Sequence, residues 1–220
     1  MMKKIKALNM LSVLILAVFS FTCQAQPLQE NQDLDARVSR FLEESSRSWY
    51  DMNVPASDGK LLHDLIVENG YTRALEIGTS TGHSSVWIAW ALSKTGGRLI
   101  TIEIDESRHQ QALENFKKAG LSDYIDAQLG DAHELVKELE GPFDFVFSDA
   151  DKGWYKNYFV DIEPKLEVNG CFTAHNISGS GRGSWGSGEF YEYVSSLPQY
   201  ETTLNRSGGG VSISYKRSEK

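Results

Sequence analysis

Hydrophobic positions recur along the chain at two spacings that alternate with each other. Residues 33–50 and 57–68 carry apolar side chains three or four positions apart, which predicts amphipathic helices. Residues 73–77 and 143–147 form short, mainly apolar runs, which are typical of buried strands. By the same criteria we expect further helices at 83–93, 107–119, 132–139, 155–165 and 189–196, and further strands at 98–104, 124–128, 170–174, 200–204 and 211–215.

This alternation of strands and helices predicts the fold class. Strands separated by helices form βαβ units, so we expect an α/β fold with a mostly parallel sheet and helices on both faces. The last two strands, which flank three consecutive glycines, are expected to pair and close the sheet. A chain of 220 residues is long enough for one such domain. Its net charge of −8 and the lack of a basic stripe argue against nucleic acid as a partner.

The N-terminal 25 residues have a different pattern from the rest of the chain. Three lysines precede an apolar run at 11–21, and small residues follow it. This layout predicts a secretory signal peptide that is removed before Gln26, leaving a single domain at 26–220 in an exported, periplasmic or secreted protein. The apolar run is shorter than the roughly 20 residues that a membrane span needs, and it would be removed with the signal peptide. No stable membrane span is therefore expected in the mature chain. A lipid anchor on Cys23 is the alternative.

Polar segments follow five of the expected strands. They are residues 76–85, 102–105, 130–133, 148–152 and 175–181. The carboxyl ends of parallel strands meet at one edge of a sheet, and ligands of such folds bind there. The five segments therefore predict one binding site at that edge.

The first of these segments contains a glycine-rich turn that fits several kinds of site. Residues 78–82 match the G-x-S-x-G elbow of serine hydrolases, with Ser80 as the nucleophile. The dinucleotide fingerprint G-x-G-x-x-G fails at its second glycine, where Ser80 stands. The turn also fits the glycine loop of a methyl-donor site, in which a helix N-terminus receives a carboxylate. A plain strand-to-helix turn explains the segment as well.

Glu103 favours the methyl-donor interpretation of this turn. It ends the second expected strand, 25 residues after Gly78, where a carboxylate can accept both hydroxyls of a ribose. A cofactor with a diphosphate would need positive charge nearby, whereas this edge is acidic. S-adenosylmethionine (SAM) has a ribose and a cationic sulfonium but no phosphate. A solvated strand end remains the simpler explanation of Glu103 alone.

Six segments of the chain form an ordered set: MNVPASDGKLL, LEIGTSTGHSS, TIEID, GDA, FDFVFSDADKGWY and GGGVSISYKR, of which FDFVFSDADKGWY is the most specific. On these segments the chain resembles, from residue 52 to residue 215, the cation-dependent O-methyltransferases of the catechol and caffeoyl-CoA type. The resemblance implies a Rossmann-like SAM methyltransferase fold with a seven-stranded sheet and an antiparallel C-terminal strand. It also implies O-methyl transfer to a small hydroxylated aromatic acceptor, and it is compatible with a homodimer.

The resemblance assigns roles to residues of this chain. The implied SAM contacts are Met52, Val54, Glu76, Gly78, Thr79, Ser80, Ser84, Glu103, Asp131, Ala132, Asp149 and Asp151. Lys152 is implied as the catalytic base. Asp149 is implied as a ligand of a divalent cation that holds two neighbouring substrate hydroxyls and lowers the pKa of the one that reacts.

One departure from the family pattern puts this cation in question. The family has Asp-Asn after the fifth strand as metal ligands, and this chain has His175-Asn176. If a cation site survives, Asp149, His175 and Asn176 form it, and the imidazole favours a transition metal over magnesium. If it does not survive, a catalytically silent SAM-binding or interaction protein becomes the alternative. A serine hydrolase acting through Ser80 is the third hypothesis. The remaining histidines, His63, His83, His109 and His133, are expected to be incidental.

Overall fold

The computed structural model describes residues 31–46, 49, 52–178 and 186–219. The expected signal peptide, Cys23 and Gln26 lie outside these residues, and so does part of the expected helix at 33–50. None of the helices within the described ranges is both long and apolar enough to cross a membrane.

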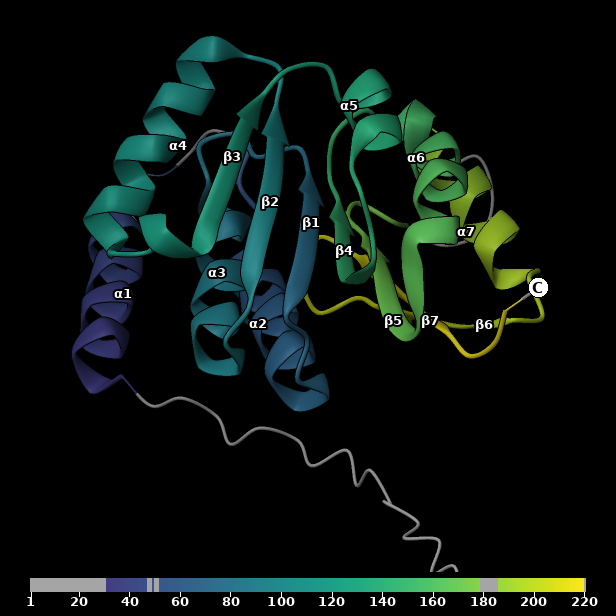
Figure 1. Ribbon diagram of the computed structural model, residues 1–220, viewed down its shortest axis with the longest axis horizontal. Helices are drawn as coiled ribbons and strands as arrows, with labels where there is room; N and C mark the ends of the chain where they lie inside the picture. The colour runs from purple at the N-terminus through teal and green to yellow at the C-terminus, as the bar shows by residue number, and fades with distance from the viewer. Residues whose placement is uncertain (1–30, 47–48, 50–51, 179–185, 220) are drawn as a thin grey trace, which may run out of the picture.

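The described strands form one mixed sheet (Figure 1). Their order across it is β3-β2-β1-β4-β5-β7-β6, and all pairs are parallel except β5 with β7 and β6 with β7. The bounds are β1 (Arg73–Ile77), β2 (Arg98–Glu103), β3 (Ile125–Leu129), β4 (Phe143–Ser148), β5 (Leu166–Ala174), β6 (Tyr200–Asn205) and β7 (Val211–Lys216). The predicted seven-stranded fold with an antiparallel C-terminal strand is therefore confirmed.

Helices cover both faces of this sheet, with α1 to α4 on one face and α5 to α7 on the other. The bounds are α1 (Gln32–Ser45), α2 (Ala56–Asn69), α3 (His83–Thr95), α4 (Glu106–Ala119), α5 (Ala132–Glu138), α6 (Tyr155–Ile162) and α7 (Ser187–Ser195). Successive side chains of a strand point to opposite faces. Thus Phe145 packs in the core under α1 to α4, while its neighbour Val146 packs under α5 to α7.

Two predicted boundaries were wrong in the region between β4 and β5. The expected helix at 155–165 ends at Ile162, and a 3₁₀ turn (Glu163–Lys165) that contains Pro164 follows it. Strand β5 begins at Leu166 instead of residue 170; the prediction missed its start because residues 167–169 are exposed and include the polar Glu167 and Asn169. Asn169 there has a φ of 70°, and the pairing with β4 shifts register.

The strand order reverses direction between β1 and β4, which are neighbours in the sheet. The chain runs from β1 outward to β2 and β3, and then returns to β4 on the other side of β1. Such a reversal leaves a crevice beyond the carboxyl ends of the two strands, where ligands bind in open α/β sheets. This geometry places the described residues of the five polar segments around one crevice.

Candidate active site

A cavity of about 620 Å³ lies beyond the carboxyl ends of β1 to β5. Each of the five strands contributes to its wall through the segment that follows it. The volume is in the range typical of small-molecule sites. Residues from all five polar segments therefore line one cavity.

Most of the sequence-predicted residues line this cavity. They are Met52, Gly78, Thr79, Ser80, Ser84, Glu103, Asp131, Ala132, Asp149, Asp151, Lys152, His175 and Asn176. Val54 and Glu76 do not. Val54 is buried in the core on the face of the sheet covered by α1 to α4, and its neighbour Asn53 lines the cavity.

Glu76 is fully buried beneath the glycine loop. One of its oxygens accepts hydrogen bonds from the hydroxyls of Ser85 and Thr101, the latter at 2.6 Å, and the other oxygen has no partner. Burial raises the pKa of Glu76 to about 7, although these hydroxyls act in the opposite direction. Glu76 therefore supports the start of α3 from below instead of touching a ligand.

The glycine loop closes tightly against the segment that follows β4. Gly78 has a φ of 100°, and a Cβ on it would lie 2.9 Å from the backbone nitrogen of Ala150. Beyond it, the backbone N–H of Ser80 donates to Glu103 Oε2 at 2.6 Å, and that of Asp105 donates to Oε1 at 2.9 Å. Two backbone donors thus fix the Glu103 carboxylate on the cavity wall.

The hydroxyl of Ser80 lacks the partner that a serine nucleophile needs. Its Oγ is buried and has no hydrogen-bond partner among the described residues. An activated serine requires a base within hydrogen-bond reach. The geometry gives no support to the hydrolase interpretation.

Two histidines that were expected to be incidental, His83 and His133, also line the cavity. The His133 ring lies 4.4 Å from the ring of Trp154, centroid to centroid, and its Nε2 is 3.5 Å from Asp151 Oδ2. Burial lowers the pKa of His83 to about 4, so this ring is neutral at physiological pH. A signal for His133 was present in the sequence, because it directly follows the matched segment GDA.

Lys152 and Asp149 form an ion pair on the cavity wall. Lys152 Nζ lies 2.9 Å from Asp149 Oδ1, at the start of the short 3₁₀ helix η2 (Lys152–Trp154). The Lys152 side chain is 23 % exposed, so it is open to the cavity. The hydroxyl of Tyr155 lies 3.5 Å from the same Asp149 oxygen and 3.2 Å from the backbone oxygen of His175.

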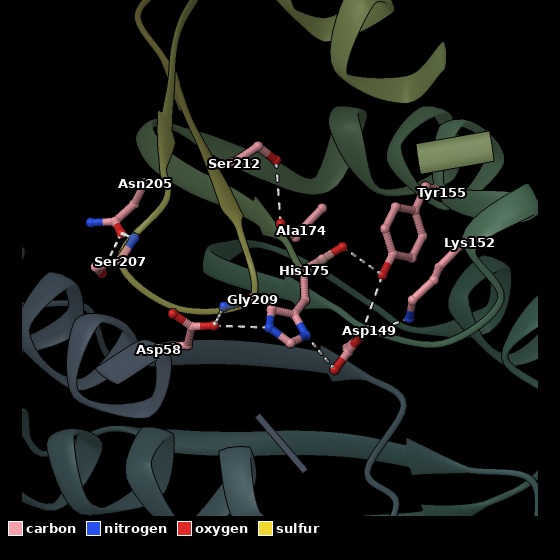
Figure 2. Close-up of polar contacts among 10 residues, drawn as sticks. All are labelled: Asp58, Asp149, Lys152, Tyr155, Ala174, His175, Asn205, Ser207, Gly209 and Ser212. Carbon is pink, nitrogen blue, oxygen red and sulfur yellow. Dashed lines mark hydrogen bonds and ion pairs between the residues drawn. The ribbon is translucent and has the colours of Figure 1, made fainter. Parts of the chain in front are cut away.

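The ring of His175 lies between two carboxylates (Figure 2). Its Nε2 is 2.9 Å from Asp58 Oδ2, and its Nδ1 is 3.1 Å from Asp149 Oδ2. Burial on its own would lower the pKa of His175, but the hydrogen bonds and charges of Asp149 and Asp58 outweigh it, so the pKa is raised. Asp58, from the first turn of α2, lies within the matched segment MNVPASDGKLL but was not among the predicted site residues.

The three candidate metal ligands line the same cavity, but the atoms of Asp149 and His175 do not fit a hard divalent cation. Both oxygens of Asp149 are paired with the side chains of Lys152 and His175, and both ring nitrogens of His175 face carboxylates. Asp149 is the single carboxylate of the set, whereas magnesium prefers several oxygen ligands. Within the described ranges, no group of three or more His, Cys, Asp or Glu side chains is arranged to hold a metal ion.

The fold and the site define a class of protein, and comparison with known proteins identifies the family. A sheet of this order with a cavity at the reversal of strand order belongs to the Rossmann-like α/β proteins. Residues 30–182 match the family model described as O-methyltransferase. The chain therefore belongs to the O-methyltransferase family.

Individual relatives agree with this assignment. A catechol O-methyltransferase from Niastella koreensis is 40% identical over 112 residues, which are 49% of this chain and 50% of that protein. Caffeoyl-CoA O-methyltransferase 1 from Eucalyptus globulus is 28% identical over 172 residues, 76% of this chain and 66% of that protein. The chain thus spans half to two thirds of the length of these curated relatives.

Solved structures show the same fold with ligands bound. An O-methyltransferase from Bacillus cereus in complex with SAH has a TM-score of 0.71 and 25% identity, and the match covers 83% of this chain and 91% of that one. TomG from Streptomyces achromogenes, in complex with SAM, has a TM-score of 0.70 and 26% identity, covering 87% and 92%.

Proposed function

We propose that this protein transfers a methyl group from SAM to a hydroxyl of a small, catechol-like aromatic acceptor. The observation that carries the proposal is the Glu103 carboxylate, which two backbone donors hold on the cavity wall. A carboxylate oxygen can accept more than one hydrogen bond, so Glu103 retains acceptor capacity for the two hydroxyls of a ribose. The position of Glu103 in the sequence, at the end of the second expected strand, favours the same contact with a ribose.

The charges of the wall support SAM over a cofactor with phosphates. Four acidic residues line the cavity at the end of β2 and after β3 and β4, against two basic ones, Arg108 and Lys152; the acids are Glu103, Asp131, Asp149 and Asp151. When bound, SAM supplies a methyl group on a positively charged sulfur, which an acidic wall attracts. The glycine loop contributes by letting the ligand approach the backbone at Gly78, where a side chain would clash with the β4 segment.

The residues at the other end of the cavity act on the acceptor. Lys152, once its ammonium has released a proton, takes the proton of the acceptor hydroxyl at Nζ. Asp149, 2.9 Å from that nitrogen, orients the amine and stabilises the ammonium that forms. The remaining contribution of the chain is to hold the acceptor oxygen and the methyl donor in line and away from water.

Binding and transfer can be tested separately. Calorimetry with SAM measures binding, and mass spectrometry of catechol and caffeoyl-CoA after incubation with isotopically labelled SAM measures transfer. We expect measurable binding of SAM, and we expect the labelled methyl group on one hydroxyl of the acceptor. An absence of SAM binding would contradict the whole proposal.

A catalytically silent SAM-binding protein is the second candidate. The pairing of Asp149 and His175 favours it, because it engages the atoms that the family is expected to use for a cation. SAM binding without transfer to any acceptor would support this candidate.

A homodimer stays a prediction, which light scattering of the purified chain tests.

A further inference from the structure

The buried cluster of Asp58, His175, Asp149 and Lys152 is balanced in charge by its own side chains. Both nitrogens of the His175 ring lie within hydrogen-bond distance of a carboxylate oxygen, at 2.9 Å and 3.1 Å (Figure 2). An ionised carboxylate only accepts hydrogen bonds, so each ring nitrogen must carry a proton in order to donate to the carboxylate beside it. Two carboxylates then face one imidazolium and one ammonium, and the cluster is neutral.

Asp58 accounts for the position of this imidazolium. Its side chain is 1% exposed, and the same oxygen that meets His175 Nε2 also accepts the backbone N–H of Gly209 at 2.7 Å. The turn before β7 packs directly on this carboxylate, because a Cβ on Gly208 would clash with Asp58 Oδ1. A buried carboxylate without a cationic partner is costly. A charged His175 ring thus supplies a cationic partner for Asp58 Oδ2, while Asp58 Oδ1 is buried without a hydrogen-bond partner among the described residues.

We propose that the His175 ring, clamped between Asp58 and Asp149, takes the place of the divalent cation expected for this family, and that the protein works without one. The inference rests on the proposed function for its catalytic meaning. His175 lies on the wall of the same cavity as Lys152, so the ring places a fixed positive charge beside the acceptor oxygen. That charge favours the ionised acceptor, which is the role that the resemblance gives to the metal. Asp58 is a positioning residue, because it acts through His175.

The rival arrangement uses the same three side chains differently. In it, Nε2 donates to Asp58 while an unprotonated Nδ1 and Asp149 share a transition metal, as in carboxylate–histidine–metal sites. A dication would then give the cluster a net positive charge, with the Lys152 ammonium 2.9 Å from a metal ligand. The protonated ring leaves the cluster neutral, whereas the metal would leave it with a net positive charge. The metal-bound arrangement is therefore the less favourable of the two.

The first experiment measures the cation itself. Elemental analysis of the purified full chain and calorimetry with Mg²⁺, Mn²⁺ and Zn²⁺ should find no bound metal in the wild type. His175→Asp leaves three carboxylates against one ammonium, so this variant should gain Mn²⁺ binding and a Mn²⁺-dependent rise in melting temperature. Gln111→Asp, which adds a carboxylate to the exposed side of α4, is the control and should gain neither. Wild-type binding of Mn²⁺ or Zn²⁺ that His175→Asn abolishes would overturn the proposal.

The second experiment reads the ring directly and does not depend on activity. Nitrogen NMR of histidine-labelled protein at neutral pH should show both nitrogens of His175 protonated, and Asp58→Asn should remove the Nε2 signature while the fold persists. An unprotonated Nδ1 bound to a metal would contradict the proposal.

Activity then separates this inference from the proposed function. Methyl transfer by the wild type should be unaffected by a chelator, and His175→Asn should lower kcat by about 10²-fold. Transfer that stops with chelator and returns with metal would sink the cation-free site while leaving the methyltransferase intact. Absence of any transfer would instead count against the proposed function, and the metal and NMR measurements would still decide the cation question.

Discussion

Asp58 and His175 stand 117 positions apart in the chain, and their side chains meet at 2.9 Å between the first turn of α2 and the end of β5. The pair joins the N-terminal helices to the C-terminal half of the sheet. His175 lies on the cavity wall and Asp58 lies behind it, so the pair couples the stability of the fold to the position of a ring in the site.

This pair should contribute measurably to stability. Asp58→Asn removes the charge but keeps the shape, and we expect it to lower the free energy of unfolding by about 1–3 kcal/mol. His175→Asn should cost a similar amount, and the double variant should lose less than the sum, with a coupling energy of about 0.5–3 kcal/mol. Denaturant unfolding of the four proteins measures this cycle. Strictly additive losses would show that the two side chains do not depend on each other.

The Glu103 carboxylate should be needed for SAM binding. Glu103→Ala removes the acceptor for the ribose hydroxyls and frees the backbone N–H groups of Ser80 and Asp105, so the binding free energy should weaken by about 1–3 kcal/mol. Calorimetry with SAM measures the change. Glu106→Ala, at the exposed start of α4, is the matched control and should bind SAM like the wild type. Unchanged affinity in Glu103→Ala would remove the ribose assignment.

Lys152 should matter for transfer far more than for SAM binding. Lys152→Met keeps the length of the side chain but cannot take a proton, and we expect kcat to fall by about 10²–10⁴-fold. The dissociation constant for SAM should stay within a few-fold of the wild type. Lys156→Met, on the exposed side of α6 over the Tyr193 ring, is the control. A proportional loss of SAM affinity would indicate that Lys152 positions the donor instead of acting as a base.

Sequence patterns predicted the sheet and its helices because hydrophobic periodicity reports directly on burial. They failed at the start of β5, where the polar residues Glu167 and Asn169 lie in an exposed stretch of the strand. Only pairing with β4 makes this segment a strand, and such pairing is a long-range property. Element boundaries of this kind are not encoded locally.

The site was predictable to the extent that its residues follow strands. Glu103 and Asp149 end up on the cavity wall because parallel strands bring their carboxyl ends to one edge. Asp58 was missed because an acid in the first turn of a helix is explained by the helix dipole alone. Glu76 was assigned to the ligand because a motif gives the order of residues but not their depth below the surface. Its burial depends on the packing of α3 against the sheet.

Export of the protein is a prediction that the described residues leave open, since it concerns residues 1–25. The basic start and the apolar run predict cleavage before Gln26. Mass spectrometry of the protein from its native host should find a chain that begins at Gln26. An intact Met1 in the cytoplasmic fraction would contradict the signal peptide, and a lipid adduct on Cys23 would support the anchored alternative.

Glu76 should make stability depend on pH near neutrality. Burial raises the pKa of its carboxyl from 4.5 to about 7 in the folded protein. The folded chain therefore holds a proton that the unfolded chain releases, and the resulting stability is complete below about pH 4.5. It is lost as the pH rises through about 7, where the folded state must carry a buried charge. The size of the loss is about 3 kcal/mol.

Glu76→Gln tests this dependence because the amide cannot ionise, while its carbonyl oxygen can still accept from Ser85 and Thr101. The variant's amide nitrogen is expected to lack a partner, since one Glu76 oxygen has none, so its stability at low pH should be below that of the wild type. Between pH 5 and 8, however, the wild type should lose stability relative to the variant. Denaturant unfolding across this range measures the difference between the two curves, and Glu138→Gln, an exposed acid at the end of α5, is the control. Parallel curves for wild type and Glu76→Gln would mean that the Glu76 carboxyl titrates alike in the folded and unfolded chains.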